Sequence, residues 1–234
     1  MNPPTMDIDA RLNILDCFYA VYDRFAGSLE TACRKHCAEC CTCNVTLTTL
    51  EAYRMLTGLT AEGRDAMRRH IEAAGRRRRF QPQLTVNAIA ERCLQGREIP
   101  EESADPSWGR CPLLEGDLCS AYPVRPLGCR CFVSRQPCRS NGCADVEERV
   151  VSVNHVFLQM VEHLDAAGCS GNLTDVLSVL TDERHGRQYR QGTLRCRRST
   201  GLIANRPVKA LMIPPRHRKD LEPILAALRA CFPY

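Results

Sequence analysis

The spacing of apolar residues predicts a mainly helical chain. Between residues 7 and 32, apolar side chains recur at steps of three and four, which places them on one face of a helix. These side chains are Leu15, Phe18, Tyr22, Phe25 and Leu29. The same stepping continues through four thiols, which we expect to project from the end of this helix along its core-facing stripe. These are Cys33, Cys37, Cys40 and Cys41.

Capping patterns and glycines define the other helices. Thr48 and Glu51 form a capping-box pattern, which predicts a helix that runs to about Leu56. Thr60 is expected to cap a helix over 61–75, and a further helix over 84–95 ends before Gly96. In the second half of the chain, apolar periodicity predicts three more helices, over 145–167, 172–180 and 219–230.

Two regions break the helical pattern. Residues 97–143 are rich in proline and glycine, which predicts a long loop with a short hairpin around Leu113–Leu118. Residues 182–218 are arginine-rich and irregular, with one strand expected at Val208–Ile213. We therefore predict a mainly α fold with an irregular cysteine-rich metal-binding core, a long Pro/Gly-rich loop and accessory helices. Residues 1–144 would form the metal-binding domain, and 145–234 a helical C-terminal accessory region packed on it.

The cysteine content changes this picture most, because the 234 residues include 16 cysteines. Such a density indicates a disulfide framework or a thiolate–metal site. The segment Met1–Asp9 lacks the basic and apolar regions of an export signal, and no run of about 18 apolar residues predicts a membrane span. We therefore expect a cytoplasmic protein with reduced thiols, in which metal binding explains the clustered cysteines.

Most of the cysteines fall into two clusters, around 33–43 and 111–143. Short spacings aim several sulfurs at one point, as tetrahedral zinc or an iron–sulfur cluster requires. Adjacent Cys40 and Cys41 are poorly placed to form a disulfide with each other. They can serve two neighbouring metals, or one metal and the core. The clusters hold enough sulfur for one site or two.

The residues that match a known motif come in two elements. The first is Cys33, Cys37, Cys40 and Cys41; the second is Cys111-Pro-Leu-Leu, then Cys119-x2-Tyr122-x2-Arg125-Pro126-x2-Cys129-Arg130. On these residues the chain resembles the YkgJ-type cysteine-cluster proteins, a zinc- or iron-chelating family named for a CxxCxxCC motif. The resemblance implies metal or iron–sulfur binding over residues 33–143.

The predicted metal ligands are Cys33, Cys37, Cys40, Cys41, Cys111, Cys119, Cys129 and Cys143. Cys43, Cys131 and Cys138 are additional to the motif and leave the ligand set open. Arg125 and Arg130 stand beside ligand cysteines, and we expect their guanidinium groups to stabilise the bound cofactor by charge and hydrogen bonding. The isolated cysteines are predicted to be structural: Cys17, Cys93, Cys169, Cys196 and Cys231.

Charge adds little to the choice of partner. The net charge of +5 suits acidic partners but also balances buried thiolates. The run Arg76–Arg79 is expected to be a solvated turn because no aromatic residues are interleaved with it, so nucleic acid is not an expected partner. His36 is expected to lie beside the site or on the surface.

Three functions remain open from the sequence. The first is redox or cluster binding by an iron–sulfur centre, expected to be a 4Fe–4S cluster. The second is a structural Zn²⁺ protein that presents a surface to a partner. The third is a group-transfer enzyme, because the cysteine motif is also similar to that of flagellin lysine-N-methylases, although no G-x-G-x-x-G cofactor fingerprint is present. The expected partners are the metal ion or cluster and a protein redox or maturation partner, with no membrane.

Overall fold

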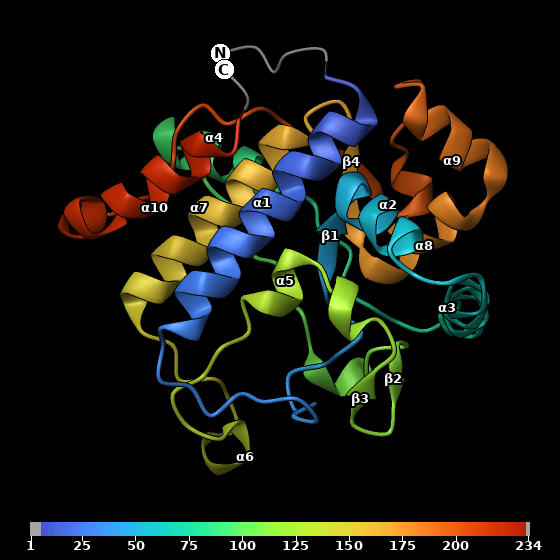
Figure 1. The fold of residues 1–234 in the computed structure, drawn as a ribbon, viewed down its shortest axis with the longest axis horizontal. Coiled ribbons are helices and arrows are strands. Elements are labelled where there is room, and N and C mark those ends of the chain that lie inside the picture. The colour runs from blue at the N-terminus through green and yellow to red at the C-terminus, as the bar shows by residue number, and fades with distance from the viewer. Residues whose placement is uncertain (1–5, 233–234) are drawn as a thin grey trace.

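The structure is a computed structural model that describes residues 6–232, and it confirms the mainly α fold class (Figure 1). Residues 1–5, part of the segment in which we expected no export signal, lie outside the described residues. The helices, in chain order, are α1 (Ile8–Gly27), α2 (Thr49–Thr57), α3 (Ala61–Ala74), α4 (Val86–Leu94), α5 (Leu127–Arg130), α6 (Cys138–Asn141), α7 (Glu148–Leu164), α8 (Leu173–Thr181), α9 (Glu183–Arg190) and α10 (Arg218–Ala230).

The first helix ends earlier than predicted. α1 stops at Gly27, and the Ser28 hydroxyl donates a hydrogen bond to the Phe25 carbonyl oxygen at 2.7 Å. Glycine has low helix propensity and the serine hydroxyl satisfies an end carbonyl, so both residues favour termination here. The prediction that the helix runs to residue 32 and carries the first cysteine cluster was therefore wrong. That cluster lies in turns beyond the helix.

The other predicted helices are confirmed with small shifts at their ends. Thr48 and Glu51 form the predicted capping box at the start of α2. The helix α9 was missed inside the region expected to be irregular; the Asp182 side chain caps it by accepting from the His185 N–H at 2.9 Å. Short 3-10 turns complete the helical content, at Pro106–Trp108, Tyr122–Val124, Arg198–Thr200 and Pro215–His217.

The strand predicted at Val208–Ile213 was wrong, and a buried side chain explains why. The Gln159 amide donates to the Ala210 carbonyl oxygen and its oxygen accepts from the Met212 N–H, each at 2.8 Å. One side chain on α7 thus satisfies the backbone groups that a neighbouring strand would otherwise satisfy. The strand in this part of the chain is instead β5 (Leu202–Ala204).

A small antiparallel sheet joins segments that are far apart in the sequence. β4 (Cys169–Asn172) lies between β1 (Thr46–Thr48) and β5, in the order β1-β4-β5. A separate hairpin pairs β2 (Leu114–Glu115) with β3 (Leu118–Cys119), which confirms the hairpin expected around this point. The sheet therefore unites the N-terminal and C-terminal halves in one hydrophobic core.

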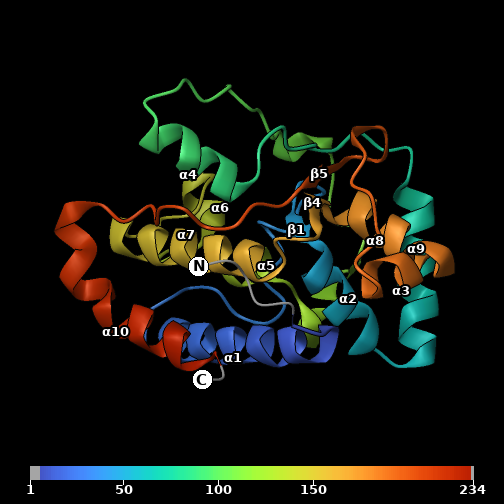
Figure 2. The same cartoon turned by 90° about the horizontal axis from the view of Figure 1, so that it is seen from above.

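One part of the core lies where α1 and α7 pack together (Figure 2). The rings of Tyr22 and Phe157 meet edge to face with centroids 5.1 Å apart, and both side chains are fully buried. The Tyr22 hydroxyl donates to Asn154 Oδ1 at 2.7 Å, so its polar end is also satisfied. No helix within residues 6–232 has the length and apolar character needed to cross a membrane.

Four of the isolated cysteines form two disulfides. Cys17 on α1 bonds Cys231 at the end of α10, and Cys169 on β4 bonds Cys196. Both pairs give these residues a structural role, although a fully reduced chain was expected. The first pair spans 214 residues of sequence, so no local spacing could reveal it.

Candidate metal centre

The first cysteine cluster is shaped by two consecutive turns. The Cys37 N–H donates to the Arg34 carbonyl oxygen at 3.0 Å, and the Cys41 N–H donates to that of Ala38 at 3.1 Å. His36 lies within the first turn in the left-handed region, with φ of 71°. These reversals fold the segment back on itself, so its thiols lie together without a helix. In Figure 1 the segment passes below α5, from the side of α6 toward the side of β2 and β3.

Seven of the eight predicted ligands line one cavity of about 220 Å³. They come from the double turn, the hairpin region and α5, and they are Cys33, Cys37, Cys40, Cys41, Cys111, Cys119 and Cys129. Cys143, the eighth, is exposed and does not line this cavity. The fold thus brings together two sequence clusters that lie about 70 residues apart.

Burial keeps several of these thiols protonated. It raises the pKa of Cys111 to about 12, and it also raises the pKa of Cys119 and Cys129. The Cys41 thiol differs, because a hydrogen bond from Cys40 lowers its pKa to about 7, with further lowering by Arg110 and Arg125. A metal that binds here would displace protons from the buried thiols, and Cys41 is the most easily ionised.

The two predicted arginines both line the cavity but differ in how they are held. Arg130 Nη1 bonds both carboxylate oxygens of Asp23, at 2.6 and 2.8 Å, and its guanidinium lies 4.3 Å from the Tyr19 ring centroid. Arg125 stacks on Tyr122 at 4.0 Å, and no carboxylate within the described residues pairs with it. Of these two arginines, Arg125 is therefore the one whose charge is free to act on thiolates. It lowers the pKa of both Cys41 and Cys119.

Glu51 links this cavity to the core, a role that sequence reasoning missed beyond its capping function. Its carboxylate accepts from the Thr48 N–H at 3.0 Å, the Tyr19 hydroxyl at 3.1 Å and the Leu127 N–H at 2.7 Å. Leu127 is the first residue of α5, which carries Cys129. Glu51 therefore fixes the start of the helix that delivers one thiol to the cavity.

Replacement of Glu51 by glutamine is expected to lower the free energy of unfolding by about 1–3 kcal/mol. The amide NH₂ would face the Leu127 N–H or the Tyr19 hydroxyl, which leaves a buried donor without an acceptor. Chemical denaturation measures this loss, and hydrogen exchange at the Leu127 amide measures it locally. Glu98→Gln, at an exposed glutamate, is the matched control. Unchanged protection of the Leu127 amide in the Glu51 variant would contradict the assigned role.

Two additional cysteines of the clusters face elsewhere. The Cys43 thiol lies 3.6 Å from the Arg78 carbonyl oxygen and 3.5 Å from Asn44 Oδ1. Cys131 is hydrogen-bonded with Tyr22, and burial raises the pKa of its thiol to about 12. Neither residue lines the cavity, whereas Arg34 does. All three thiols that the sequence left open, Cys43, Cys131 and Cys138, are thus absent from the wall of this cavity.

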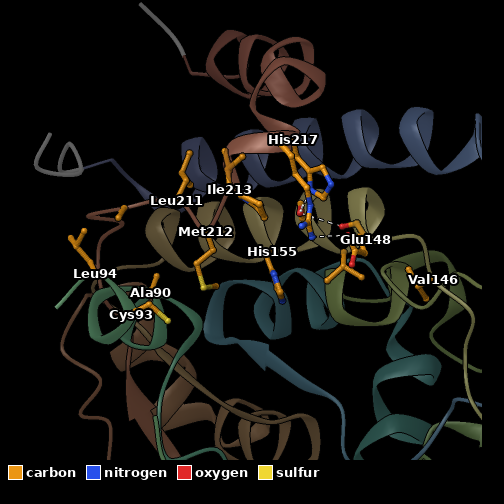
Figure 3. A pocket seen from close by; sticks show the side chains of 15 residues that line it. Ala90, Cys93, Leu94, Val146, Glu148, His155, Leu211, Met212, Ile213 and His217 are labelled. Carbon is orange, nitrogen blue, oxygen red and sulfur yellow. Dashed lines mark hydrogen bonds and ion pairs between the residues drawn. The ribbon is translucent and has the colours of Figure 1, made fainter. Parts of the chain in front are cut away.

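A larger cavity, of about 630 Å³, lies between α4, α7 and the segment before α10 (Figure 3). His217 Nδ1 lies 2.8 Å from Ser152 Oγ, and the Ser152 hydroxyl donates to the Glu148 carbonyl oxygen at 3.2 Å. This pair is a structural hydrogen bond, and most of the cavity wall is apolar.

Within residues 6–232, no set of three or more Cys, His, Asp or Glu side chains is already arranged to hold a metal ion. Comparisons of the chain with protein-family models, curated proteins and solved structures found no match. The family resemblance therefore stays a prediction, and the chemistry of the cavity carries the argument for function.

Proposed function

We propose that this protein binds metal through cysteine thiolates and that it holds an iron–sulfur cluster. The observation that carries the proposal is the cavity wall, where seven cysteines from separate segments meet beside Arg125. Thiolates are the ligands that iron–sulfur clusters and zinc prefer, and their negative charge is stabilised by guanidinium groups close by. When bound, such a cluster supplies one-electron transfer.

The size of the cavity favours a cluster over a lone zinc ion. A zinc ion binds sulfur at about 2.3 Å and leaves little space between its four ligands. The cavity of about 220 Å³ is several times the share of volume, roughly 30 Å³, that one water molecule takes in the liquid. A polynuclear centre fills such a space better than a single ion does. A structural zinc site is the alternative to be distinguished.

The side chains around the cavity bind and orient the centre. Ser134 donates its N–H to Cys33 Sγ at 3.2 Å, a hydrogen bond of the kind that tunes cluster potentials. Phe132, also on the cavity wall, is 45% exposed, so an apolar surface patch adjoins the cavity there. We propose that a protein redox or maturation partner reaches the centre on this side.

The test is anaerobic purification of the full chain, followed by iron, sulfide and zinc analysis and a visible spectrum. We expect a coloured protein with iron and sulfide in stoichiometric amounts. Cys41→Ser with Cys129→Ser should lose most of the bound metal, whereas Cys93→Ser, at an exposed free thiol, should keep it. A colourless protein with stoichiometric zinc would support the zinc alternative, and equal metal content in all variants would refute thiolate binding by the cavity.

A cytoplasmic location is part of the proposal, because the cavity thiols must be reduced to bind metal. The disulfides Cys17–Cys231 and Cys169–Cys196 are of a kind that persists in oxidising compartments. Alkylation of free thiols in intact cells, read by mass spectrometry, distinguishes a reducing compartment from an oxidising one. Labelled cavity thiols would support loading in a reducing compartment, and full protection of all 16 cysteines without metal would oppose it.

A further inference from the structure

We propose that a separate cavity, between the end of α3 and the β2–β3 hairpin, binds the phosphate group of a small phosphate monoester. Its volume is about 300 Å³, at the lower end of the range for small-molecule sites. Cys111 lines both this cavity and the cysteine-lined one, so the two adjoin. Phosphate binding here does not require a metal at the neighbouring cavity.

Three basic side chains line this cavity, and no Asp or Glu of the described residues does. His70 lies on α3, Arg77 in the turn after it, and Arg110 just before the hairpin. Within residues 6–232 the side chains of His70 and Arg77 make no hydrogen bond or ion pair, and His70 Nδ1 is buried without a partner. Rotation of the histidine ring about its Cβ–Cγ bond turns either nitrogen toward the cavity. Because like charges at one cavity repel each other, a bound anion would stabilise this arrangement.

The backbone of Arg77 is held in place before any ligand binds. Its N–H donates to the Ala74 carbonyl oxygen at 2.9 Å, and its own carbonyl oxygen accepts from Arg79 Nη1 at 2.8 Å. Arg79 is in turn fixed by two hydrogen bonds to the Asp175 carboxylate, at 2.6 and 3.1 Å. The arginine run is therefore anchored at one residue and unpartnered at another. An arginine on a fixed backbone loses less conformational freedom when it binds an anion.

Arg79 also offsets the charge of the helix end beside the cavity. The C-terminal end of a helix carries partial negative charge on its free carbonyl groups, which would repel a phosphate. Arg79 Nη1 donates to the carbonyl oxygens of Ala74 and Gly75 at 3.4 and 3.0 Å. The guanidinium group therefore neutralises the end of α3, and the charges of the cavity wall remain positive.

Arg110 is positioned by contacts of its own. Its backbone pairs with Thr42 in an antiparallel bridge, and its Nη2 donates to Asp117 Oδ1 at 2.7 Å. Asp117 does not line the cavity. A guanidinium group has five N–H donors, so one bond to Asp117 orients Arg110 and leaves donors for a phosphate.

The donors of the cavity fit a phosphate monoester better than a carboxylate. Such a phosphate has three free oxygens and a charge near −2 at neutral pH. Two guanidinium groups and one imidazole supply donors for all three oxygens. Ala73, Pro112 and Leu114 give the wall an apolar part, which would contact the organic group of the ester.

The test is isothermal titration calorimetry of the full chain in phosphate-free buffer, with phenyl phosphate, inorganic phosphate and phenol as probes. We expect phenyl phosphate to bind more tightly than inorganic phosphate, because its ring contacts the apolar part of the wall. Phenol should give no measurable binding. Arg77→Gln and Arg110→Gln should each weaken phenyl phosphate binding by about tenfold, the effect of losing one charge-assisted hydrogen bond.

The matched control is Arg76→Gln, which removes the same charge from the same run at a residue that does not line the cavity. Its affinity should stay within about twofold of the wild type, because a distant exposed charge is screened. Arg77→Lys keeps the charge but loses the fork of donors, so it should weaken binding less than Arg77→Gln does. Circular dichroism of each variant establishes that the helical fold is intact.

The metal state of the chain provides a second control. Binding should be the same as purified and after dialysis against a chelator, and loss of binding on metal removal would assign the phosphate to the metal instead. Equal weakening by Arg76→Gln and Arg77→Gln would reveal a general basic surface and overturn the site. Inorganic phosphate bound as tightly as phenyl phosphate would overturn the choice of a monoester. No binding of phenyl phosphate, with no shift of the His70 ring protons in nuclear magnetic resonance spectra, would overturn the proposal as a whole.

Discussion

Replacement of Asp165 by alanine is expected to lower the free energy of unfolding by about 3–5 kcal/mol, the largest effect of any single substitution considered. The Asp165 carboxylate is fully buried and accepts five hydrogen bonds from four parts of the chain. The donors are Arg11 Nη1 at 3.2 Å, the Thr49 hydroxyl at 2.6 Å, the Leu50 N–H at 3.0 Å, the Tyr189 hydroxyl at 2.8 Å and Asn205 Nδ2 at 3.2 Å. Alanine would leave all of these buried donors without an acceptor.

Urea denaturation measures this loss, with Glu222→Ala on α10 as the control, because that glutamate is exposed. The control should change the free energy of unfolding by no more than about 0.5 kcal/mol. Asp165→Asn should fall between the two, since the amide keeps one acceptor and turns an NH₂ group toward donors. A loss below about 1 kcal/mol for Asp165→Ala would contradict the view that this carboxylate organises the core.

The same residue predicts a pH dependence. Burial raises the pKa of Asp165 to about 6, above its usual value of about 3.9 in an unfolded chain. The folded state therefore binds this proton more tightly, so the resulting stabilisation is complete below pH 4 and is lost as the pH rises through 6. The difference in stability between wild type and Asp165→Asn should accordingly be larger at pH 4 than at pH 7.5.

Removal of the Cys17–Cys231 disulfide is expected to lower the free energy of unfolding by about 3–5 kcal/mol. The bond closes a loop of 214 residues, so its loss gives the unfolded chain much more conformational freedom. It also ties α10 to α1, where the rings of Phe18 and Phe232 meet with centroids 5.7 Å apart. Cys17→Ser with Cys231→Ser should therefore unfold at lower denaturant concentration, and the amides of α10 should exchange faster.

Cys93→Ser is the matched control for this pair, because Cys93 is exposed and free. Its unfolding should match that of the wild type. Loss of the Cys169–Cys196 bond should cost less than loss of the first, since that bond closes only 27 residues. An unchanged midpoint in the Cys17 and Cys231 double variant would show that helix packing alone holds α10 in place.

The helices were predictable because their signals are local. The capping box at Thr48 and Glu51 and the apolar periodicity of α7 depend on residues within a few turns of one another. Errors arose where a tertiary contact decided the outcome. Gln159 on α7 satisfies the backbone around residues 210–212, and no pattern within that segment shows that such a partner exists.

The sequence by itself singled out many of the residues that line the cavity. The spacing of the cysteines identified seven thiols and two arginines that line the cavity, because ligand type and short spacing are properties of the chain. The sequence also predicted that the first cluster lies on a helix end. This was wrong, because α1 ends at Gly27 and Ser28, before the first of these cysteines. The predicted ligands also included Cys143, which is exposed and does not line the cavity.

Only the tertiary structure decided which thiols face one another. Thiols of the two sequence clusters line one cavity, and contacts between segments about 100 residues apart, such as the Ser134 N–H to Cys33 Sγ hydrogen bond and the Arg139–Glu39 ion pair, hold these segments together. Cys17 and Cys231 meet for the same reason, across 214 residues. Such proximities arise from the packing of whole elements around one core, and sequence spacing carries no record of them. The gathering of seven cluster thiols around one cavity is therefore a property of the fold.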